Sequence, residues 1–246
     1  MRLKTSRLFL LILILLSSFE LYAAHIVGGD FSYRHISGDT YEIKMKMYRD
    51  CGGGGAGFEQ FLSVNIFDKE TNLQVKAITM PRTSIYRIRF NTGCTSPELR
   101  CVEAGIFVGQ FTMPKANFNN TSGYYVSWER CCRNNIIKNI VDPGGTPMAF
   151  YMELASPYPA NGDFRANSSP EFRRDPLNYL CVGEAFKYDF KAYDEDGDEL
   201  RISKIEPLAG GATSPINVGP ESNSAPFDNT IWNTGYSLTN LMDGNP

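Results

Sequence analysis

Apolar and polar residues alternate with a period of two in several parts of the chain. In one segment Tyr41, Ile43, Met45 and Met47 alternate with Glu42, Lys44 and Lys46, and in another Tyr124, Val126 and Trp128 alternate with Tyr125, Ser127 and Glu129. Successive side chains of an extended chain point to opposite faces, so this pattern is typical of a strand with one buried face. Both segments are therefore predicted to be half-buried β-strands.

Further short segments have the apolar and β-branched character of strands. Clusters of Gly, Pro, Asn or Asp, which indicate turns, bound the segments 61–67, 73–78, 86–90, 106–113 and 148–154. No stretch of useful length has the apolar period of a helix. Short strands at regular spacing, with turns between them, predict an all-β fold of the β-sandwich type.

A change of composition divides the chain. Residues 156–176 are rich in proline and small polar residues, as a linker is. We therefore expect a first sandwich domain over residues 24–160, a linker over 161–176 and an immunoglobulin-like or cadherin-like domain over 177–246. Its expected strands are the alternating segment 186–192 and a return through Leu200 and Ile202.

The second domain is expected to be incomplete. Residues 167–246 number 80, whereas an immunoglobulin-like sandwich takes about 100 residues and seven strands. The sequence stops on Asp-Gly and Asn-Pro pairs, which are turn signals that normally lead into another strand. Further domains of a longer parent chain are therefore expected beyond residue 246.

Residues 1–23 have the pattern of a secretory signal peptide. Three basic residues precede an apolar run over residues 8–16, and short side chains follow at Ala23 and Ala24. A transmembrane anchor would need about 20 apolar residues, and Glu20 stands close behind this shorter run. The segment is therefore predicted to be removed on export, and no later segment is apolar enough to span a bilayer.

An even number of cysteines in an exported chain predicts disulfides rather than metal ligands. The six are Cys51, Cys94, Cys101, Cys131, Cys132 and Cys181. They allow 15 pairings, although Cys94 and Cys101 bracket a turn-rich segment and are placed to close a local loop. Neighbouring side chains of an extended chain point to opposite faces, so Cys131 and Cys132 are expected to have separate, distant partners. Cys51 and Cys181 are the remaining candidates.

Charge and motifs argue against several classes of function. The formal net charge is −3 and 21% of residues are charged, which indicates neither nucleic acid nor an anionic membrane as partner. The chain has two histidines and neither H-E-x-x-H nor G-x-S-x-G. The glycines of residues 52–57 match the dinucleotide-binding spacing, but a strand-like segment follows instead of a helix. We therefore expect a non-catalytic protein.

Acidic residues crowd around Gly197 in the stretch KAYDEDGDELRISK, residues 191–204. Asp194 and Asp196 are two residues apart at an expected strand end, so both side chains leave on one face, about 7 Å apart. Asp198 can add a third oxygen after the turn. The spacing does not fit an EF-hand, because the glycine is fourth and the twelfth residue is Ile205. The candidate ligand is calcium, and the alternative is a solvated acidic turn.

Six motifs follow one another along the mature sequence: HIVGGDFSYR, YEIKMKMYRDCGG, CVEAGIFVG, ERCCRNNIIKNI, NSSPEF and AYDEDGDEL. Together they resemble the N-terminal region of large secreted surface proteins of gliding Gram-negative bacteria, of the gliding-motility-associated or PKD-repeat type. The resemblance implies an extracellular or cell-surface location, type IX secretion and further β-sandwich repeats. It implies no catalytic residue.

The last two motifs also resemble those of cadherin-like and immunoglobulin-like repeats, in which an Asn-x-x-Pro linker opens a domain and a D-x-D motif binds calcium. This resemblance implies that Asp194 and Asp196 are calcium ligands. The linker departs from the cadherin pattern, because Asn167 alone keeps an oxygen ligand there.

Pattern and resemblance together predict a secreted cell-surface structural or adhesion protein, with calcium as the candidate ligand that would stiffen it. Its expected partner is a cell-surface or extracellular polymer or protein. The alternative is a carbohydrate-binding module of a secreted glycan-processing system. It rests on the 13% of aromatic residues on a β scaffold, among them Tyr124, Tyr125, Trp128 and Trp232. Aromatic residues of strands more often belong to the core.

Overall fold

The computed structural model describes residues 26–52, 57–89, 101–131, 133–173, 175, 187–211 and 224–242. The predicted signal peptide lies outside these residues. The regular secondary structure of the described part consists of β-strands alone, which confirms the predicted all-β fold. No helix in this part of the chain is long and apolar enough to cross a membrane.

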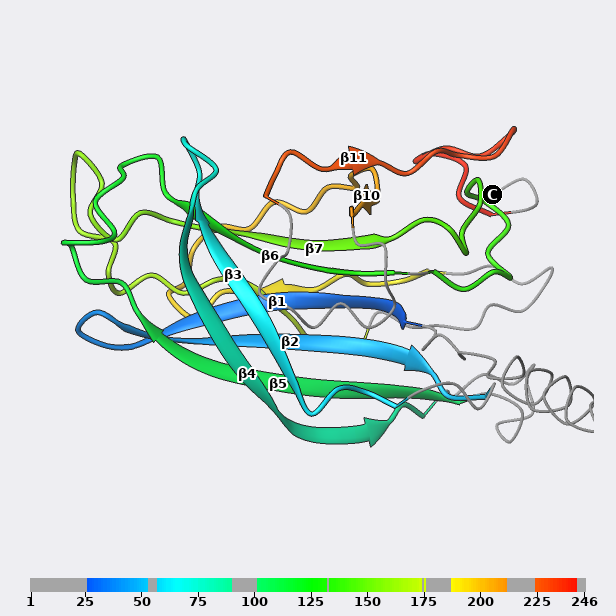
Figure 1. Ribbon diagram of the computed structural model, residues 1–246, viewed down its shortest axis with the longest axis horizontal. Coiled ribbons are helices and arrows are strands. Elements are labelled where there is room, and N and C mark those ends of the chain that lie inside the picture. The colour runs from blue at the N-terminus through cyan, green and yellow to red at the C-terminus, as the bar shows by residue number, and fades with distance from the viewer. Residues whose placement is uncertain are drawn as a thin grey trace, which may run out of the picture.

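Seven strands build one antiparallel sheet that folds over on itself. They are β1 (Ile26–Ser37), β2 (Thr40–Asp50), β3 (Phe61–Asp68), β4 (Gln74–Arg87), β5 (Val102–Thr112), β6 (Tyr124–Arg130) and β7 (Met148–Leu154). Their order in the sheet is β1-β2-β5-β4-β3-β6-β7. Strands β1, β2 and β5 form one layer, and β3, β6 and β7 form the other (Figure 1). The fold is thus of the β-sandwich type.

Strand β4 belongs to both layers. Its residues from Gln74 to Pro81 pair with β3, and those from Arg82 to Arg87 pair with β5. Proline has no backbone N–H to donate to a ladder, and Pro81 stands where the pairing changes from one neighbour to the other. The ribbon of β4 curves accordingly from β3 toward β5 (Figure 1). The two strands predicted at residues 73–78 and 86–90 are therefore parts of the single bent strand β4, which ends at Arg87.

The core lies between the two layers. The predicted apolar face of β2, from Tyr41 to Met47, is fully buried there. It belongs to one cluster with inward side chains of β3 such as Val64 and of β6 such as Trp128. Burial of this face explains why the alternation in the sequence located the strand correctly.

Strand β1 was not predicted, because glycine interrupts its pattern. A Cβ at Gly29 would lie 2.7 Å from the carbonyl oxygen of Lys46 and 3.0 Å from the ring of Phe150. No side chain fits this space without a shift of the backbone. The absence of a Cβ thus lets β1 pack closely against β2 and approach β7, the other edge of the sheet.

The prediction of a half-buried strand is wrong for β6, because all seven of its residues are buried. Its inner face joins the core, and later segments of the chain cover its outer face. The N–H of Ala225 donates to the hydroxyl of Tyr125 at 2.9 Å, and the N–H of Gly211 donates to the carboxylate of Glu129. The polar residues of the alternation are therefore buried with partners rather than exposed to water.

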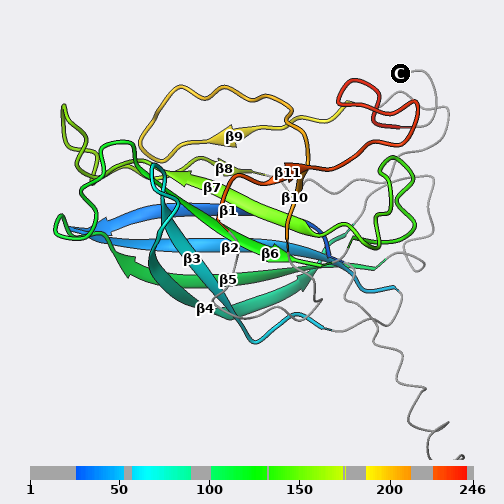
Figure 2. The ribbon, with the colours of Figure 1, turned by 45° about the horizontal axis from the view of Figure 1, so that its top comes forward.

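Two further pairs of strands have only two residues each: β8 (Glu171–Phe172) with β9 (Ala192–Tyr193), and β10 (Leu208–Ala209) with β11 (Asp228–Asn229). Among the described residues of the expected segment 186–192, only Ala192 lies in a strand, and residues 200–202 form none. Strands β8 and β9 lie on the β1 and β7 side of the sandwich, away from β4 (Figure 2). The division into domains stays a prediction.

Part of the expected linker lies along β1. We call residues 167–173 and 175 the strap. Within it, the hydroxyl of Ser169 accepts a hydrogen bond from the N–H of Tyr33 at 2.8 Å, and the backbone N–H of Ser169 donates to the Tyr33 carbonyl at 2.8 Å. The hydroxyl of Ser168 accepts the N–H of His35 at 3.3 Å. The strap thus occupies part of the edge of β1 that faces away from β2.

Candidate functional site

The acidic residues of the strap bind polar side chains on the outer face of β1 and β2. Glu171 accepts a hydrogen bond from the ammonium of Lys44 at 2.6 Å and one from the hydroxyl of Ser32 at 3.1 Å. Lys44 points away from the core because it alternates with Ile43 and Met45 in β2. This alternation places the cation where the strap crosses.

A second anchor lies further along the strap. One carboxylate oxygen of Asp175 accepts hydrogen bonds from the hydroxyls of Tyr48 at 3.0 Å and Tyr86 at 3.1 Å. The ammonium of Lys46 lies 3.3 Å from the same oxygen. Strands β2 and β4 thus hold the strap through one carboxylate.

The electrostatics of this outer face follow from burial and pairing. Burial raises the pKa of Asp30, and the neighbouring Lys46 and Lys44 oppose this rise only in part. Burial alone would raise the pKa of Glu171 as well, but the hydrogen bond and positive charge of Lys44 outweigh it and lower the value. The pKa values of the two carboxyl groups therefore shift in opposite directions: pairing with Lys44 favours the ionised form of Glu171, whereas burial makes Asp30 harder to ionise than an exposed aspartate.

Burial also raises the pKa of Tyr86, which lies beside Asp175. Burial, followed by the negative charge of Asp175 and the hydrogen bond to it, raises the pKa of Tyr86 to about 12. The phenol therefore stays protonated at neutral pH and keeps donating to the carboxylate.

A groove of about 370 Å³ lies beside Glu171 on this face. Its lining consists of Ser32, Tyr33, Arg34, Glu42, Lys44, Glu171, Tyr193 and Glu195. Arg34 and Glu42 form an ion pair with a nitrogen-to-oxygen distance of 2.9 Å. Tyr193 in β9 stands directly opposite Glu171 in β8, so the pairing of these two strands places one ring and one carboxylate side by side.

The proposed calcium ligands lie in a turn and do not converge. Asp194 accepts the N–H of Asp196 at 2.9 Å, and Asp196 accepts the N–H of Ser168 in the strap at 2.5 Å. Gly197 has a φ of 86°, which favours glycine in the turn. In the described part of the chain these two carboxylates and that of Asp198 form no cluster close enough for a shared cation. The carboxylate chemistry suits calcium, but Asp194 and Asp196 have backbone partners in this conformation.

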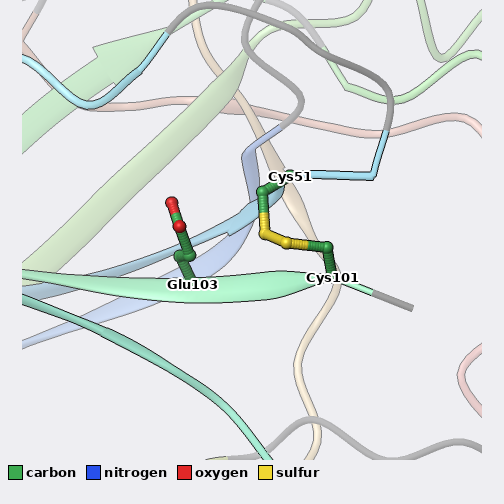
Figure 3. A group of neighbouring side chains, drawn as sticks. All are labelled: Cys51, Cys101 and Glu103. Atoms are coloured by element: carbon green, nitrogen blue, oxygen red, sulfur yellow. A yellow bond between two sulfur atoms is a disulfide. The ribbon is translucent and has the colours of Figure 1, made fainter. Parts of the chain in front are cut away.

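The cluster of metal-ligand type that the described residues do form is Cys51, Cys101 and Glu103 (Figure 3). Its two sulfur atoms are joined in a disulfide, so neither is a thiolate that could bind a metal. The carboxylate of Glu103 pairs with Arg49 at 2.6 Å. This cluster is structural.

The disulfide corrects the expected local pairing of Cys94 with Cys101. Cys101 pairs with Cys51 instead, because β2 and β5 are neighbours and bring the two residues together just beyond Asp50 and Val102. Cys51 is therefore not the distant partner of Cys131 or Cys132 that it was expected to be, although Cys131 is disulfide-bonded too. The other three cysteines, Cys94, Cys132 and Cys181, lie outside the described residues.

Most of the aromatic residues that suggested carbohydrate binding belong to the interior. Tyr124 and Tyr125 are 1% exposed and Trp128 is 2% exposed, so none offers a surface to a ligand. Trp232 is half-buried, and its indole N–H donates to Glu206 at 2.6 Å. Sequence reasoning missed Tyr193, because it stands next to the acidic stretch and has no aromatic pattern around it.

Comparison of the chain with protein-family models, with curated proteins and with solved structures finds no match.

Proposed function

We propose that the protein is an exported, non-catalytic structural or adhesion protein of the cell surface, connected with gliding motility or type IX secretion. The observation that supports this most is the disulfide bonding of Cys51, Cys101 and Cys131. Disulfides form and persist in oxidising compartments and are rare in the cytosol. Binding of calcium to the acidic turn of Asp194, Asp196 and Asp198 remains part of this proposal.

The arrangement of the strap also supports a structural role. Backbone and hydroxyl groups of the strap bond to β1, and its carboxylates bond to lysines of β2. Contacts of this kind, made across the edge and the outer face of one layer, oppose local opening of the edge strand. A protein that holds or spaces other components at a surface needs such rigidity.

The test uses the native protein in its own cells. Intact cells are treated with a membrane-impermeant amine reagent, and the protein is isolated for mass spectrometry and for thiol titration under denaturing, non-reducing conditions. We expect labelling on intact cells, an N-terminus at Ala24 or His25 and close to zero free thiols. A strain that lacks the gene should attach less to surfaces.

An intracellular protein with an intact Met1 and two or more free thiols would contradict the proposal. Normal attachment by the deletion strain would exclude adhesion and leave the structural role. A defect in the cell surface of that strain would then be the evidence for a structural role.

A further inference from the structure

We propose that the groove on the outer face of β1 and β2 binds a neutral carbohydrate of one or two sugar rings. The proposal deepens the adhesion function, on which it rests, by naming the class of ligand. It depends on the shape of the groove, on its charge and on one exposed aromatic ring.

The groove is built from groups that hold one another in place. Lys44 and Ser32 lie on the sheet and both donate to Glu171, which strand β8 supplies to the lining. Its volume of about 370 Å³ is near the lower end of the ~300–1,000 Å³ of ligand sites. The polar groups are thus preorganised for a small ligand, which reduces the entropy lost on binding.

The charge of the lining favours a neutral ligand. Its two cations already have carboxylate partners, as Arg34 pairs with Glu42 at 2.9 Å and Lys44 with Glu171 at 2.6 Å. Glu195 adds a third carboxylate to the lining. This excess of negative charge repels a phosphate or a uronate, and a cation would find the carboxylates of Glu42 and Glu171 already paired.

Sugar hydroxyls suit such a lining, because each one both donates and accepts. They can donate to the carboxylates and accept from the ammonium and guanidinium groups, and hydrogen bonds to charged groups are stronger than neutral ones. The ligand can therefore use the charged pairs without separating them.

Tyr193 supplies an apolar surface. The residue is 41% exposed, and the guanidinium of Arg173 lies 5.3 Å from the centre of its ring. A tyrosine ring gives a large amphipathic contact with little loss of side-chain entropy. The C–H face of a pyranose can pack against such a ring, while the ring hydroxyls reach the neighbouring polar groups.

The experiment uses the purified exported protein. It is applied to an array of neutral β-glucan, mannan and chitin oligosaccharides, printed beside uronate-containing and phosphorylated ones, and titration calorimetry then follows the best neutral probe. We expect binding to neutral probes, and roughly tenfold or greater weakening by Tyr193→Ala and by Glu195→Gln. Phe61→Ala, which removes an aromatic ring on β3 that is 50% exposed and lies outside the groove lining, should bind as the wild type does.

Thermal melting of each variant separates lost binding from lost folding, and Glu195→Gln changes an exposed residue. Absence of binding to any neutral probe at millimolar concentration would overturn the proposal, as would binding that both variants leave unchanged. Binding to acidic probes alone would also overturn it.

The failure of this proposal is distinguishable from failure of the function. If the protein binds glycan but is found inside the cell, the groove proposal stands and the surface role is refuted. Surface location with no glycan binding would do the reverse.

Discussion

Cys51 and Cys101 form a disulfide directly beyond the last residue pair of the β2–β5 ladder, and their Cα atoms are 4.9 Å apart. The N–H of Cys51 also donates to the carbonyl of Cys101 at 2.8 Å. The disulfide therefore extends an existing ladder and joins two cysteines that are 50 residues apart in the sequence.

Removal of this disulfide should destabilise the protein. We expect Cys51→Ala combined with Cys101→Ala to lower the free energy of unfolding by about 2–4 kcal/mol, since the unfolded chain regains the freedom of a long loop. Urea unfolding of the exported protein measures the change. A loss below about 0.5 kcal/mol would show that the ladder holds the two strands together without the covalent bond.

Two adjacent glycines of β1 should respond differently to the same substitution. Gly29→Ala would place a Cβ 2.7 Å from a backbone oxygen, whereas a Cβ at Gly28 meets nothing within 4 Å. We expect Gly29→Ala to cost about 1–3 kcal/mol through overpacking and Gly28→Ala to stay within about 0.5 kcal/mol of the wild type. Denaturant unfolding of both variants gives the comparison, and equal effects would contradict the close approach of β1 to β2 and β7.

The hydroxyls of the strap should protect the edge of β1. Ser168→Ala with Ser169→Ala removes the acceptors of the His35 and Tyr33 N–H groups, at a cost of about 1 kcal/mol for each hydrogen bond. Hydrogen exchange should become faster at these two amides and stay unchanged in β6. Ser84→Ala on β4, which is exposed, is the control. Unchanged exchange at Tyr33 would argue against a docked strap in solution.

The effect of Asp30 on stability should depend on pH. Its folded pKa is raised by burial, so the folded state binds the proton more tightly than the unfolded state and ionisation at neutral pH destabilises the fold. We expect Asp30→Asn to be more stable than the wild type at pH 7. The difference should shrink as the pH falls through the raised pKa toward the usual value of 3.8. A difference that does not vary with pH would show that Asp30 does not titrate in this range.

Calcium should raise the melting temperature if the acidic turn binds it. Binding would have to release the N–H groups of Asp196 and Ser168 from the carboxylates that now accept them, so we expect weak affinity, with a Kd of about 10⁻⁴ to 10⁻³ M. Melting curves with added calcium test this. Asp194→Asn with Asp196→Asn should abolish the rise, and an unchanged response in this variant would place the ion elsewhere.

Local sequence pattern was sufficient where one face of a strand enters the core. The alternation of β2 and the apolar segments of β3, β5 and β7 located these strands to within a few residues. The pattern was insufficient at β1, where Gly29 replaces an apolar residue, and at β6, where Glu129 and Ser127 are buried by chain segments far away in the sequence. Burial of both faces depends on tertiary contacts that no window of neighbouring residues contains.

The candidate site was less predictable for the same reason. The contact of Lys44 with Glu171 joins residues 127 positions apart, and nothing near either residue marks it. The acidic stretch did predict a turn, but its spacing could not reveal that Asp196 would accept the N–H of Ser168. Side-chain type showed which groups can bind a ligand, and only the fold shows which of them meet.

The bend of β4 at Pro81 has a mechanical consequence. A tensile load on β3 passes to β5 through the covalent backbone of β4, because one strand is hydrogen-bonded to both. Two separate sheets could shear past each other by breaking only side-chain packing. Here such sliding would also have to break the backbone hydrogen bonds between β4 and β3 or those between β4 and β5. The two layers therefore resist a shearing load as one unit.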